Sequence, residues 1–193
     1  MTDDSATAYE THARAFLDIR DRSDIGAAVV ERWARSLSPG TETLEIGCGG
    51  GLPVTRALID AGLKVWATDA SPTMISEFRE RFPDLPAVCE RIQDGACFNR
   101  RFGALIAVGL VFLLDEADQR GFVARASALL EPGGRFLFSA PVEAGTWDDL
   151  TTGIQSLSLG RGVYEALLDQ AGFRVVGCHT DNGNGNYYDV ELR

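Results

Sequence analysis

The sequence predicts an α/β fold built on a mostly parallel sheet that ends in an antiparallel hairpin. Between residues 41 and 140, short apolar segments typical of strands alternate with longer segments typical of helices. Such alternation predicts parallel strands, because parallel neighbours need a crossover helix between them. The last two strand-like segments, 173–178 and 187–192, are joined by the short loop 181–186, so this pair must be antiparallel.

The elements can be assigned in order along the chain. Apolar residues at helical spacing over 6–37 predict one or two helices that end near Pro39 and Gly40. The apolar run 43–46 enters a glycine cluster, which indicates a strand followed by a tight turn. The later elements are expected to be helix 52–61, strand 64–68, helix 71–81, strand 87–90, strand 104–108, helix 115–130, turn 131–134, strand 135–140, an irregular segment 141–161 and helix 162–171.

Composition and charge limit the possible functions. The chain has 193 residues, 45% hydrophobic and 24% charged, as expected for one globular domain. Its formal net charge of −10 would repel a phosphate backbone, so we expect no nucleic-acid binding. No segment approaches ~20 consecutive apolar residues, and Met1 is followed by Thr2, Asp3 and Asp4 rather than by a cationic and apolar leader. We therefore expect a cytoplasmic protein with no membrane association.

The cysteines and histidines predict no metal site. The four cysteines include no C-x-x-C pair, and the two histidines, His12 and His179, stand far apart in the sequence. Cys89 and Cys178 are expected to be small buried apolar residues in a reducing compartment.

The segment Glu45-Ile46-Gly47-Cys48-Gly49-Gly50-Gly51 follows a predicted buried strand and precedes a helix. Glycine costs conformational order, so four glycines in five positions need a physical reason. Bare backbone lets a ligand approach the end of the strand, where N–H groups at the helix N-terminus face it. A tight turn without a ligand is the alternative interpretation.

Asp69 closes the next strand and lies 22 positions after Gly47. In a strand–helix–strand unit, this spacing places a carboxylate beside the glycine turn, where it can accept hydrogen bonds from both hydroxyls of a ribose. The two features together predict a nucleoside-bearing cofactor. The alternative is that Asp69 caps the helix that begins near Ser71 and Pro72.

A nicotinamide-dependent dehydrogenase is a second interpretation of the same glycines. Its third glycine normally falls three positions after the second, where this chain has Leu52, and the single lysine, Lys64, lies inside a strand. The spacing Gly47, Gly49, Gly51 instead resembles class I S-adenosylmethionine-dependent methyltransferases, in which a strand ending in an acidic residue leads into G-x-G-x-G.

The resemblance covers nearly the whole chain. Residues 68–75 resemble the acidic loop of that family, and residues 130–135 resemble the turn before its fifth strand. The resemblance implies a Rossmann-like, seven-stranded sheet in the order 3-2-1-4-5-7-6, with strand 7 antiparallel and helices on both faces. It also implies a single domain, 1–193, with an N-terminal helical lid (1–40), a cofactor-binding core (41–140) and a substrate-side segment carrying the last helix and hairpin (141–193).

Carried over by position, the resemblance implies a site for S-adenosylmethionine, with S-adenosylhomocysteine as product. The backbone at Gly47, Cys48 and Gly49 would lie against the methionine part, and Asp69 would hold the ribose. Cys48 is expected to be a small neighbour of the sulfonium and not a nucleophile. The complete set of expected cofactor residues is Glu45, Gly47, Cys48, Gly49, Asp69, Ala70, Met74, Glu90, Arg91, Ile92, Val108 and Gly109, with Gln93 and Asp94 as the alternative to Glu90 and Arg91 at the adenine edge.

Substrate residues are expected in the segments above the carboxyl ends of the strands. Tyr9 would close over the cofactor, although it could also simply anchor its helix. The run that follows the fourth strand is apolar and either lines the methyl group or packs in the core. The expected residues are Tyr9, His12, Leu110, Phe112, Trp147 and Tyr187. Gly103 stands where the family often has an aspartate, which implies the loss of a local hydrogen bond.

Methyl transfer from a sulfonium mainly requires that the acceptor be held in line, about 3 Å from the methyl carbon. If a base is needed, His12, Glu143 and Asp148 are the candidates, with a plain surface histidine as the alternative for His12. The chain lacks the Asn/Asp-Pro-Pro-aromatic run and the Pro-Cys nucleophile of enzymes that methylate bases. The expected acceptor is therefore a small molecule, with hydroxyl, amine, thiol and carbon acceptors all open. A catalytically silent, regulatory protein that binds S-adenosylmethionine is the alternative, and a closed acceptor pocket would distinguish it.

Overall fold

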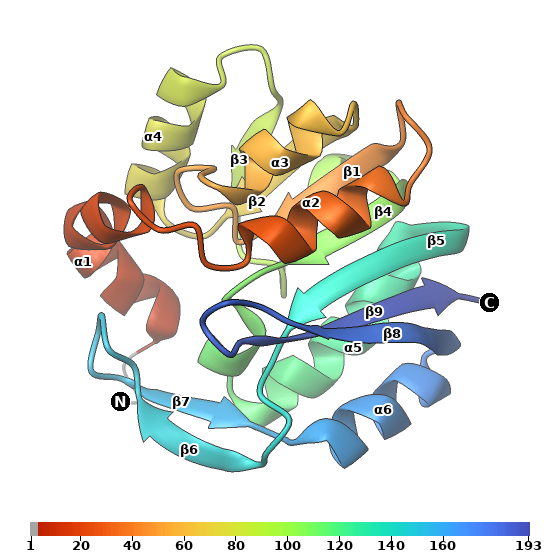
Figure 1. Cartoon of the computed structure of the whole chain (residues 1–193). Helices are drawn as coiled ribbons and strands as arrows, with labels where there is room; N and C mark the ends of the chain where they lie inside the picture. Colours follow the sequence, from red (N-terminus) through yellow and green to blue (C-terminus); the bar gives the residue numbers. More distant parts are fainter. Residues whose placement is uncertain (1–3) are drawn as a thin grey trace.

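A seven-stranded sheet forms the centre of the structure, a computed structural model that describes residues 4–193 (Figure 1). Its strand order is β3-β2-β1-β4-β5-β9-β8, and β1 to β5 are parallel whereas β9 runs antiparallel to both of its neighbours. This confirms the predicted order, with β8 and β9 as the last two strands of the sheet. The strands are β1 (Glu42–Ile46), β2 (Lys64–Asp69), β3 (Ala87–Cys89), β4 (Phe102–Ala107), β5 (Leu130–Ser139), β8 (Phe173–Thr180) and β9 (Asn186–Leu192).

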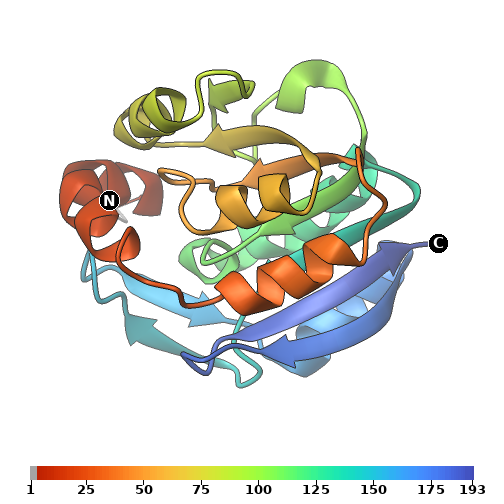
Figure 2. The same ribbon diagram turned by 45° about the horizontal axis from the view of Figure 1, so that its top comes forward.

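Helices cover both faces of the sheet, as Figures 1 and 2 show. One face carries α2 (Ala27–Arg35), α3 (Val54–Asp60) and α4 (Pro72–Arg81), and the other carries α5 (Glu116–Leu129) and α6 (Arg161–Gln170). The first helix, α1 (Ser5–Arg20), packs against α4 at the carboxyl end of the strands. Two short 3₁₀ turns, η1 (Cys97–Asn99) and η2 (Val111–Leu113), flank β4.

Local sequence explains where the helices begin. The Ser71 hydroxyl accepts a hydrogen bond from Met74 N at 3.1 Å, and Pro72 occupies the first position of α4, where its missing N–H costs nothing. The Asp115 side chain caps α5 in the same way, accepting from Asp118 N at 2.8 Å. The Ser71 cap fixes the start of α4 next to the carboxyl end of β2, where the site lies.

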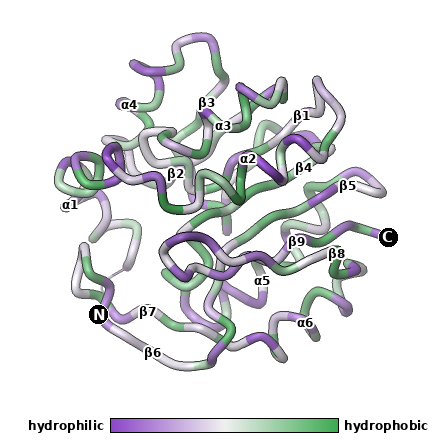
Figure 3. The backbone as a smooth tube through the Cα atoms, viewed as in Figure 1, coloured by the Kyte–Doolittle hydropathy of each residue, from purple (hydrophilic) through white to green (hydrophobic). Residues whose placement is uncertain are grey.

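The core between the sheet and α5 and α6 is aromatic. Phe138 stacks on Tyr188, with ring centroids 4.9 Å apart, and Tyr164 meets Tyr188 edge-on at 5.7 Å. Figure 3 shows apolar residues along the central strands and polar residues at many of the outer turns. Burial of these rings supplies much of the driving force that holds the strands in register.

The segment 141–161, which was expected to be irregular, contains a small two-stranded sheet, so that prediction was wrong. It comprises β6 (Gly145–Asp148) and β7 (Gln155–Ser158), which pair antiparallel beside the N-terminal end of α1 (Figure 1). All four residues of β6 are exposed, so the strand lacks the apolar alternation by which strands are recognised. The turn between the strands is held by the Asp149 carboxylate, which accepts from Thr152 N at 2.8 Å.

Two further expectations were corrected by the structure. Cys89 and Cys178 are exposed, because β3 and β8 are the two edge strands of the sheet, whereas Cys48 and Cys97 are buried. Residues 131–134 were expected as a turn ahead of the fifth strand, but β5 already begins at Leu130, which pairs with Phe102 before the register shifts. The segment 131–134 is thus an irregularity inside the strand.

Within residues 4–193, no helix is long and apolar enough to cross a membrane. The same residues contain no group of histidine, cysteine, aspartate and glutamate side chains that could hold a metal ion.

Asp189 joins three elements of the fold. Its buried carboxylate in β9 accepts a hydrogen bond from Trp33 Nε1 of α2 at 3.1 Å and from Arg135 Nε of β5 at 3.2 Å. His179 Nε2 on β8 lies 3.6 Å from the same carboxylate. Removing this group would leave a largely buried guanidinium and an indole N–H without their partner.

We therefore expect Asp189→Ala to lower the free energy of unfolding by about 3–5 kcal/mol, as measured by urea denaturation. The matched control is Glu191→Ala, two residues along the same strand, whose carboxylate pairs with the more exposed Arg174 at 2.8 Å. Loss of a surface pair of this kind costs about 0–1 kcal/mol. Equal effects of the two substitutions would contradict a special role for Asp189.

Glu45 is a buried carboxyl in the central strand β1, only 3% exposed. Thr55 Oγ1 in α3 donates a hydrogen bond to Glu45 Oε2 at 2.6 Å. Burial raises the pKa of Glu45 from 4.5 to about 8, the hydrogen bond from Thr55 opposes that rise, and the Asp69 charge adds to it. The folded protein therefore keeps Glu45 protonated at pH values where the unfolded chain has lost the proton.

The free energy of unfolding should consequently fall as pH rises from 4.5 through about 8, because in this window the folded state binds more protons than the unfolded state. Glu45→Gln keeps an acceptor for Thr55 and removes the titration. The variant should match the parent near about pH 5 and exceed it by a few kcal/mol near about pH 9, as measured by urea denaturation at each pH. A parallel pH dependence of the two proteins, with the exposed Glu80→Gln as control, would refute this assignment.

Candidate functional site

A cavity of about 460 Å³ lies at the carboxyl ends of the parallel strands. Open α/β sheets bind their ligands at this edge. The loops that follow β1 to β5 form its floor, and α1, the β6–β7 turn and the β8–β9 turn cover it. The expected site residues in its walls are Gly47, Gly49, Asp69, Ala70, Met74, Glu90, Arg91, Ile92, Val108, Gly109, Tyr9, Leu110, Phe112 and Tyr187.

The turn after β1 requires its glycines. Gly47, Gly49 and Gly51 have φ values of 71°, 54° and 89°, in the left-handed region that side chains disfavour. A Cβ atom on Gly51 would collide with the Phe82 ring, whereas one on Gly49 would meet no atom closer than 3.8 Å. Packing against Phe82 thus explains Gly51, whereas a Cβ on Gly49 would make only ordinary contacts with Phe16 and Met74, and the backbone of Gly49 lines the cavity.

Asp69 binds the glycine turn directly. Its Oδ2 atom accepts a hydrogen bond from Gly49 N at 2.8 Å, and Oδ1 accepts one from Ser71 N at 2.9 Å. Burial raises the pKa of Asp69, and the backbone hydrogen bonds partly offset that rise. The helix cap of α4 is Ser71, so the alternative that Asp69 caps this helix does not hold.

Glu45 and Cys48 lie behind the glycine turn and not in the wall of the main cavity. They line an adjoining recess of about 50 Å³ together with Arg20. Burial raises the pKa of the Cys48 thiol well above its ordinary value, and the charges of Asp69 and Glu45 add to the effect. A thiol that stays protonated is a poor nucleophile, in line with the expectation from the sequence.

Glu90 lines the cavity and so does Gln93 of the alternative pair, whereas Asp94 is exposed and lies outside the cavity wall. Both Glu90 oxygens accept backbone hydrogen bonds, from Cys97 N and Ala96 N at 2.9 Å each. The carboxylate thereby holds the turn η1, whose three residues all have positive φ. Arg91, the next lining residue, forms an ion pair with Asp4.

The segment after β4 forms an apolar wall. Leu110 and Phe112 line the cavity with Leu113 and Leu114 of the same run. Gly109 N donates a hydrogen bond to Ser139 Oγ at 2.7 Å, which connects the ends of β4 and β5. Leu110 and Leu114 also pack on the core beneath this wall, with Val111 between them in the sequence.

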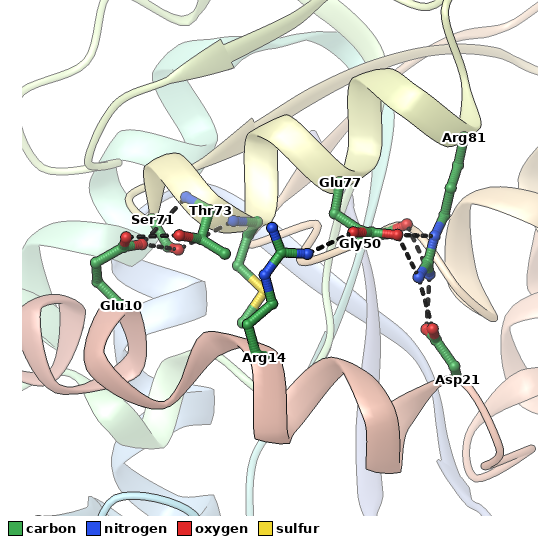
Figure 4. A network of polar contacts seen from close by, with 9 residues as sticks. Glu10, Arg14, Asp21, Gly50, Ser71, Thr73, Glu77 and Arg81 are labelled. Carbon is green, nitrogen blue, oxygen red and sulfur yellow. Dashed lines mark hydrogen bonds and ion pairs between the residues drawn. The ribbon is translucent and has the colours of Figure 1, made fainter.

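Polar and charged side chains hold α1 against α4, as Figure 4 shows. The Glu10 carboxylate accepts hydrogen bonds from the Ser71 hydroxyl and from Thr73 Oγ1, the second at 2.7 Å, and these bonds lower the pKa of Glu10. Further along, Arg14 pairs with Glu77 at 3.0 Å, and Arg81 pairs with both Glu77 and Asp21. Tyr9, Phe16 and Arg20, on another side of α1, line the cavity.

Two tyrosines in the cavity wall donate hydrogen bonds to aspartates in the covering turns. Tyr9 Oη donates to Asp149 Oδ2 at 3.1 Å, and Tyr187 Oη donates to Asp181 Oδ2 at 2.8 Å. Burial raises the pKa of each tyrosine, and the neighbouring aspartate raises it further. Both hydroxyls therefore stay protonated at neutral pH.

Two expected substrate residues lie outside the cavity. His12 is exposed on α1, where its Nδ1 lies 2.9 Å from Ala8 O, and it does not line the cavity. Trp147 lies on exposed β6 and reaches the site only through Phe112, with ring centroids 5.6 Å apart.

The sequence did not single out Arg20, Ser139, Asp149 or Asp181 as site residues, yet all four line the cavity. Arg20 shares the helical phase of Ala13 and Leu17, so its inward position could have been found from that phase. Nothing in the pattern distinguished the two aspartates from ordinary turn residues, which commonly bind backbone amides of their own turn.

Related sequences share the core of the chain. Residues 43–134 match the family described as Methyltransferase domain. A 37.1 kDa protein encoded in a transposon of Streptomyces fradiae is 29% identical over 68% of this chain, which corresponds to 38% of that protein's length. An uncharacterized methyltransferase of Synechocystis sp. is 26% identical over 82% of this chain and 78% of its own length. The chain thus spans well under half of the transposon relative.

Solved structures share the fold. The glycopeptide N-methyltransferase MtfA superposes with a TM-score of 0.72 at 20% identity, over 93% of this chain and 100% of that chain, and it has also been solved with S-adenosylmethionine and with S-adenosylhomocysteine. The magnesium protoporphyrin IX methyltransferase ChlM of Synechocystis superposes with a TM-score of 0.67 at 13% identity, over 98% and 82% of the two chains. The family match covers the glycine turn and Asp69, so residues 43–134 form a methyltransferase domain, and the strand order is that of the class I S-adenosylmethionine-dependent methyltransferase fold.

Proposed function

We propose that the chain transfers the methyl group of S-adenosylmethionine to a small-molecule acceptor inside the cavity at the carboxyl ends of the strands. The observation that carries the proposal is the position of the Asp69 carboxylate, which is bonded to the bare backbone of Gly49 in the cavity floor. A carboxylate beside an open glycine turn suits a nucleoside whose ribose hydroxyls can donate to it.

The residues of the floor fit the cofactor that this family uses. The oxygens of Asp69 can accept further hydrogen bonds from ribose hydroxyls, since a carboxylate has about four lone-pair sites. Ala70 and Met74 would flank the adenine, and Glu90, Arg91 and Ile92 would border its edge. Gly47, Cys48 and Gly49 would hold the methionine part, with Glu45 behind them, and Val108 and Gly109 would lie on the methyl side.

Bound S-adenosylmethionine supplies a methyl group already activated on a sulfonium sulfur. The protein's part is then to hold the acceptor in line with that carbon and to exclude water. Leu110 and Phe112 provide an apolar wall for this purpose, and Tyr9 of α1 and Tyr187 of β9 cover the cavity. The protonated thiol of buried Cys48 takes no covalent part.

The size and charge of the site favour a small acceptor. A volume of about 460 Å³ lies within the ordinary range of small-molecule pockets, which is roughly 300–1,000 Å³. The net charge of −10 opposes a nucleic-acid acceptor. The cavity continues past the floor residues to the covering turns, which supports an enzyme with an acceptor site over a silent binding protein. In the division we propose for the single domain, 1–40 and 141–193 enclose the acceptor and 41–140 holds the cofactor.

Calorimetric titration tests this proposal. We expect micromolar binding of S-adenosylmethionine and S-adenosylhomocysteine and none of NADH. Asp69→Asn should weaken that binding about tenfold or more, because it removes the charge and one acceptor oxygen.

Asp60→Asn is the matched control, since Asp60 is an exposed carboxylate at the end of α3 and should leave the affinity unchanged. A urea unfolding curve of each variant separates lost binding from lost fold. If neither sulfur nucleoside binds to the folded parent protein, the proposed function is wrong.

A further inference from the structure

We propose that the methyl acceptor is an amine, selected by the Tyr9 hydroxyl and the Asp149 carboxylate where α1 meets the β6–β7 turn. This inference rests on the proposed function, because it names the substrate class of the same cavity. It concerns residues that belong to the covering segments and not to the floor that would hold the cofactor.

The Tyr9–Asp149 pair presents hydrogen-bond acceptors to the cavity. Tyr9 Oη donates its proton to Asp149 Oδ2 at 3.1 Å, so the phenolic oxygen keeps lone pairs that can accept from an incoming donor. Asp149 Oδ1 is taken up by the turn, accepting from Thr151 N at 3.1 Å and from Thr152 N and Thr152 Oγ1 at 2.8 Å each. Asp149 Oδ2 and the phenolic oxygen of Tyr9 can each still accept a hydrogen bond, and both atoms therefore favour a ligand with N–H groups.

The other charged groups of the cavity wall are already matched. Arg91 pairs with Asp4, and the carboxylates of Asp69 and Glu90 accept backbone amides of the floor loops. Two carboxylates remain in the covering turns. Asp181 interacts electrostatically with the Arg20 guanidinium, whereas no cationic side chain within residues 4–193 forms an ion pair with Asp149. A cationic ligand would therefore be attracted to Asp149 in particular.

Neighbouring aromatic and apolar surface suits the rest of such a ligand. The Tyr9 ring meets the Phe16 ring edge-on at 5.4 Å, and the same cavity wall carries Leu110 and Phe112. An ammonium group close to a tyrosine ring gains a further cation–π attraction. Burial and the Asp149 charge raise the pKa of Tyr9, so the phenol remains protonated and bonded to Asp149.

The pair can also accept the proton that an ammonium must lose before it reacts. No histidine, lysine or cysteine occurs among the described residues that line the main cavity. As nitrogen passes its proton to Tyr9 Oη, the phenolic proton moves to Asp149 Oδ2, and half-exposed Asp149 returns it to water. The freed nitrogen lone pair forms the N–CH₃ bond while the S–CH₃ bond breaks. The electron pair of the S–CH₃ bond stays on sulfur, which becomes a neutral thioether.

Three probes that share a phenyl ring and a two-carbon chain test the selection: 2-phenylethylamine, 2-phenylethanol and phenylacetate. Each is titrated by calorimetry into the protein saturated with S-adenosylhomocysteine. We expect the amine to bind about tenfold more tightly than the alcohol, and the carboxylate to bind most weakly. Asp149→Asn, which keeps an oxygen for the turn, should bring amine and alcohol to within about twofold of each other.

Asp148→Asn is the matched control, because Asp148 is the neighbouring carboxylate, exposed and outside the cavity wall; it should keep the full preference for the amine. Tyr9→Phe leaves the Asp149 turn intact and should reduce the preference, so the test does not depend on one variant. The inference would be wrong, and the proposed function would stand, if the parent protein bound amine and alcohol equally. The same holds if Asp148→Asn and Asp149→Asn reduced the preference for the amine equally. Failure to bind S-adenosylhomocysteine at the outset would overturn the proposed function and the inference with it.

Discussion

The site depends on one hydrogen-bonded junction at the end of β2. Asp69 accepts from Gly49 N at the end of β1 and from Ser71 N at the start of α4, and its own carbonyl accepts from Glu90 N after β3 at 2.9 Å. Thr68 O, one residue earlier, accepts from both Gly47 N and Cys48 N. Because parallel strands end at the same edge, a single residue can order three consecutive loops there. The glycine turn, the adjoining helix and the third strand end all take their positions from it.

The segments that cover the floor are fixed by a different kind of interaction. α1 rests on α4 through a small apolar cluster and a row of carboxylate, hydroxyl and guanidinium contacts (Figure 4). The two covering turns are shaped by aspartates that bind backbone amides of their own turn, Asp149 at Thr152 and Asp181 at Gly185. Polar contacts of this kind order a loop without an apolar core beneath it, and they leave the lining residues free to differ while the floor stays the same.

The sequence predicted the residues of the cavity floor much better than those of the segments that cover it. Apolar runs that enter glycines are strong signals, because a buried parallel strand is apolar on both faces, and from them the sequence predicted Asp69 beside the turn. The strand β6 carried no such signal, since its residues are exposed throughout and its pairing comes from a turn. The same limit explains Cys89 and Cys178, because a local pattern does not show which strands become the edges of a sheet. Asp149 was missed for a related reason: its partner, Tyr9, lies 140 residues away, and only the folded chain brings the two together.

The contrast between floor and cover bears on how acceptor choice can arise in this fold. Enzymes whose named substrates are a glycopeptide and a magnesium porphyrin share the sheet, so the sheet itself does not encode the acceptor. In this chain, the carboxylates of Asp69 and Glu90 in the cavity floor accept hydrogen bonds from backbone amides of the floor loops. The floor therefore has few polar groups with which to select an acceptor in addition to the cofactor. The segments that cover the cavity supply such groups: the phenolic oxygen of Tyr9 and the carboxylate of Asp149, which come from elements 140 residues apart and are hydrogen-bonded to each other. Specificity that resides in such a pair could change by altering two residues while the cofactor floor kept its geometry.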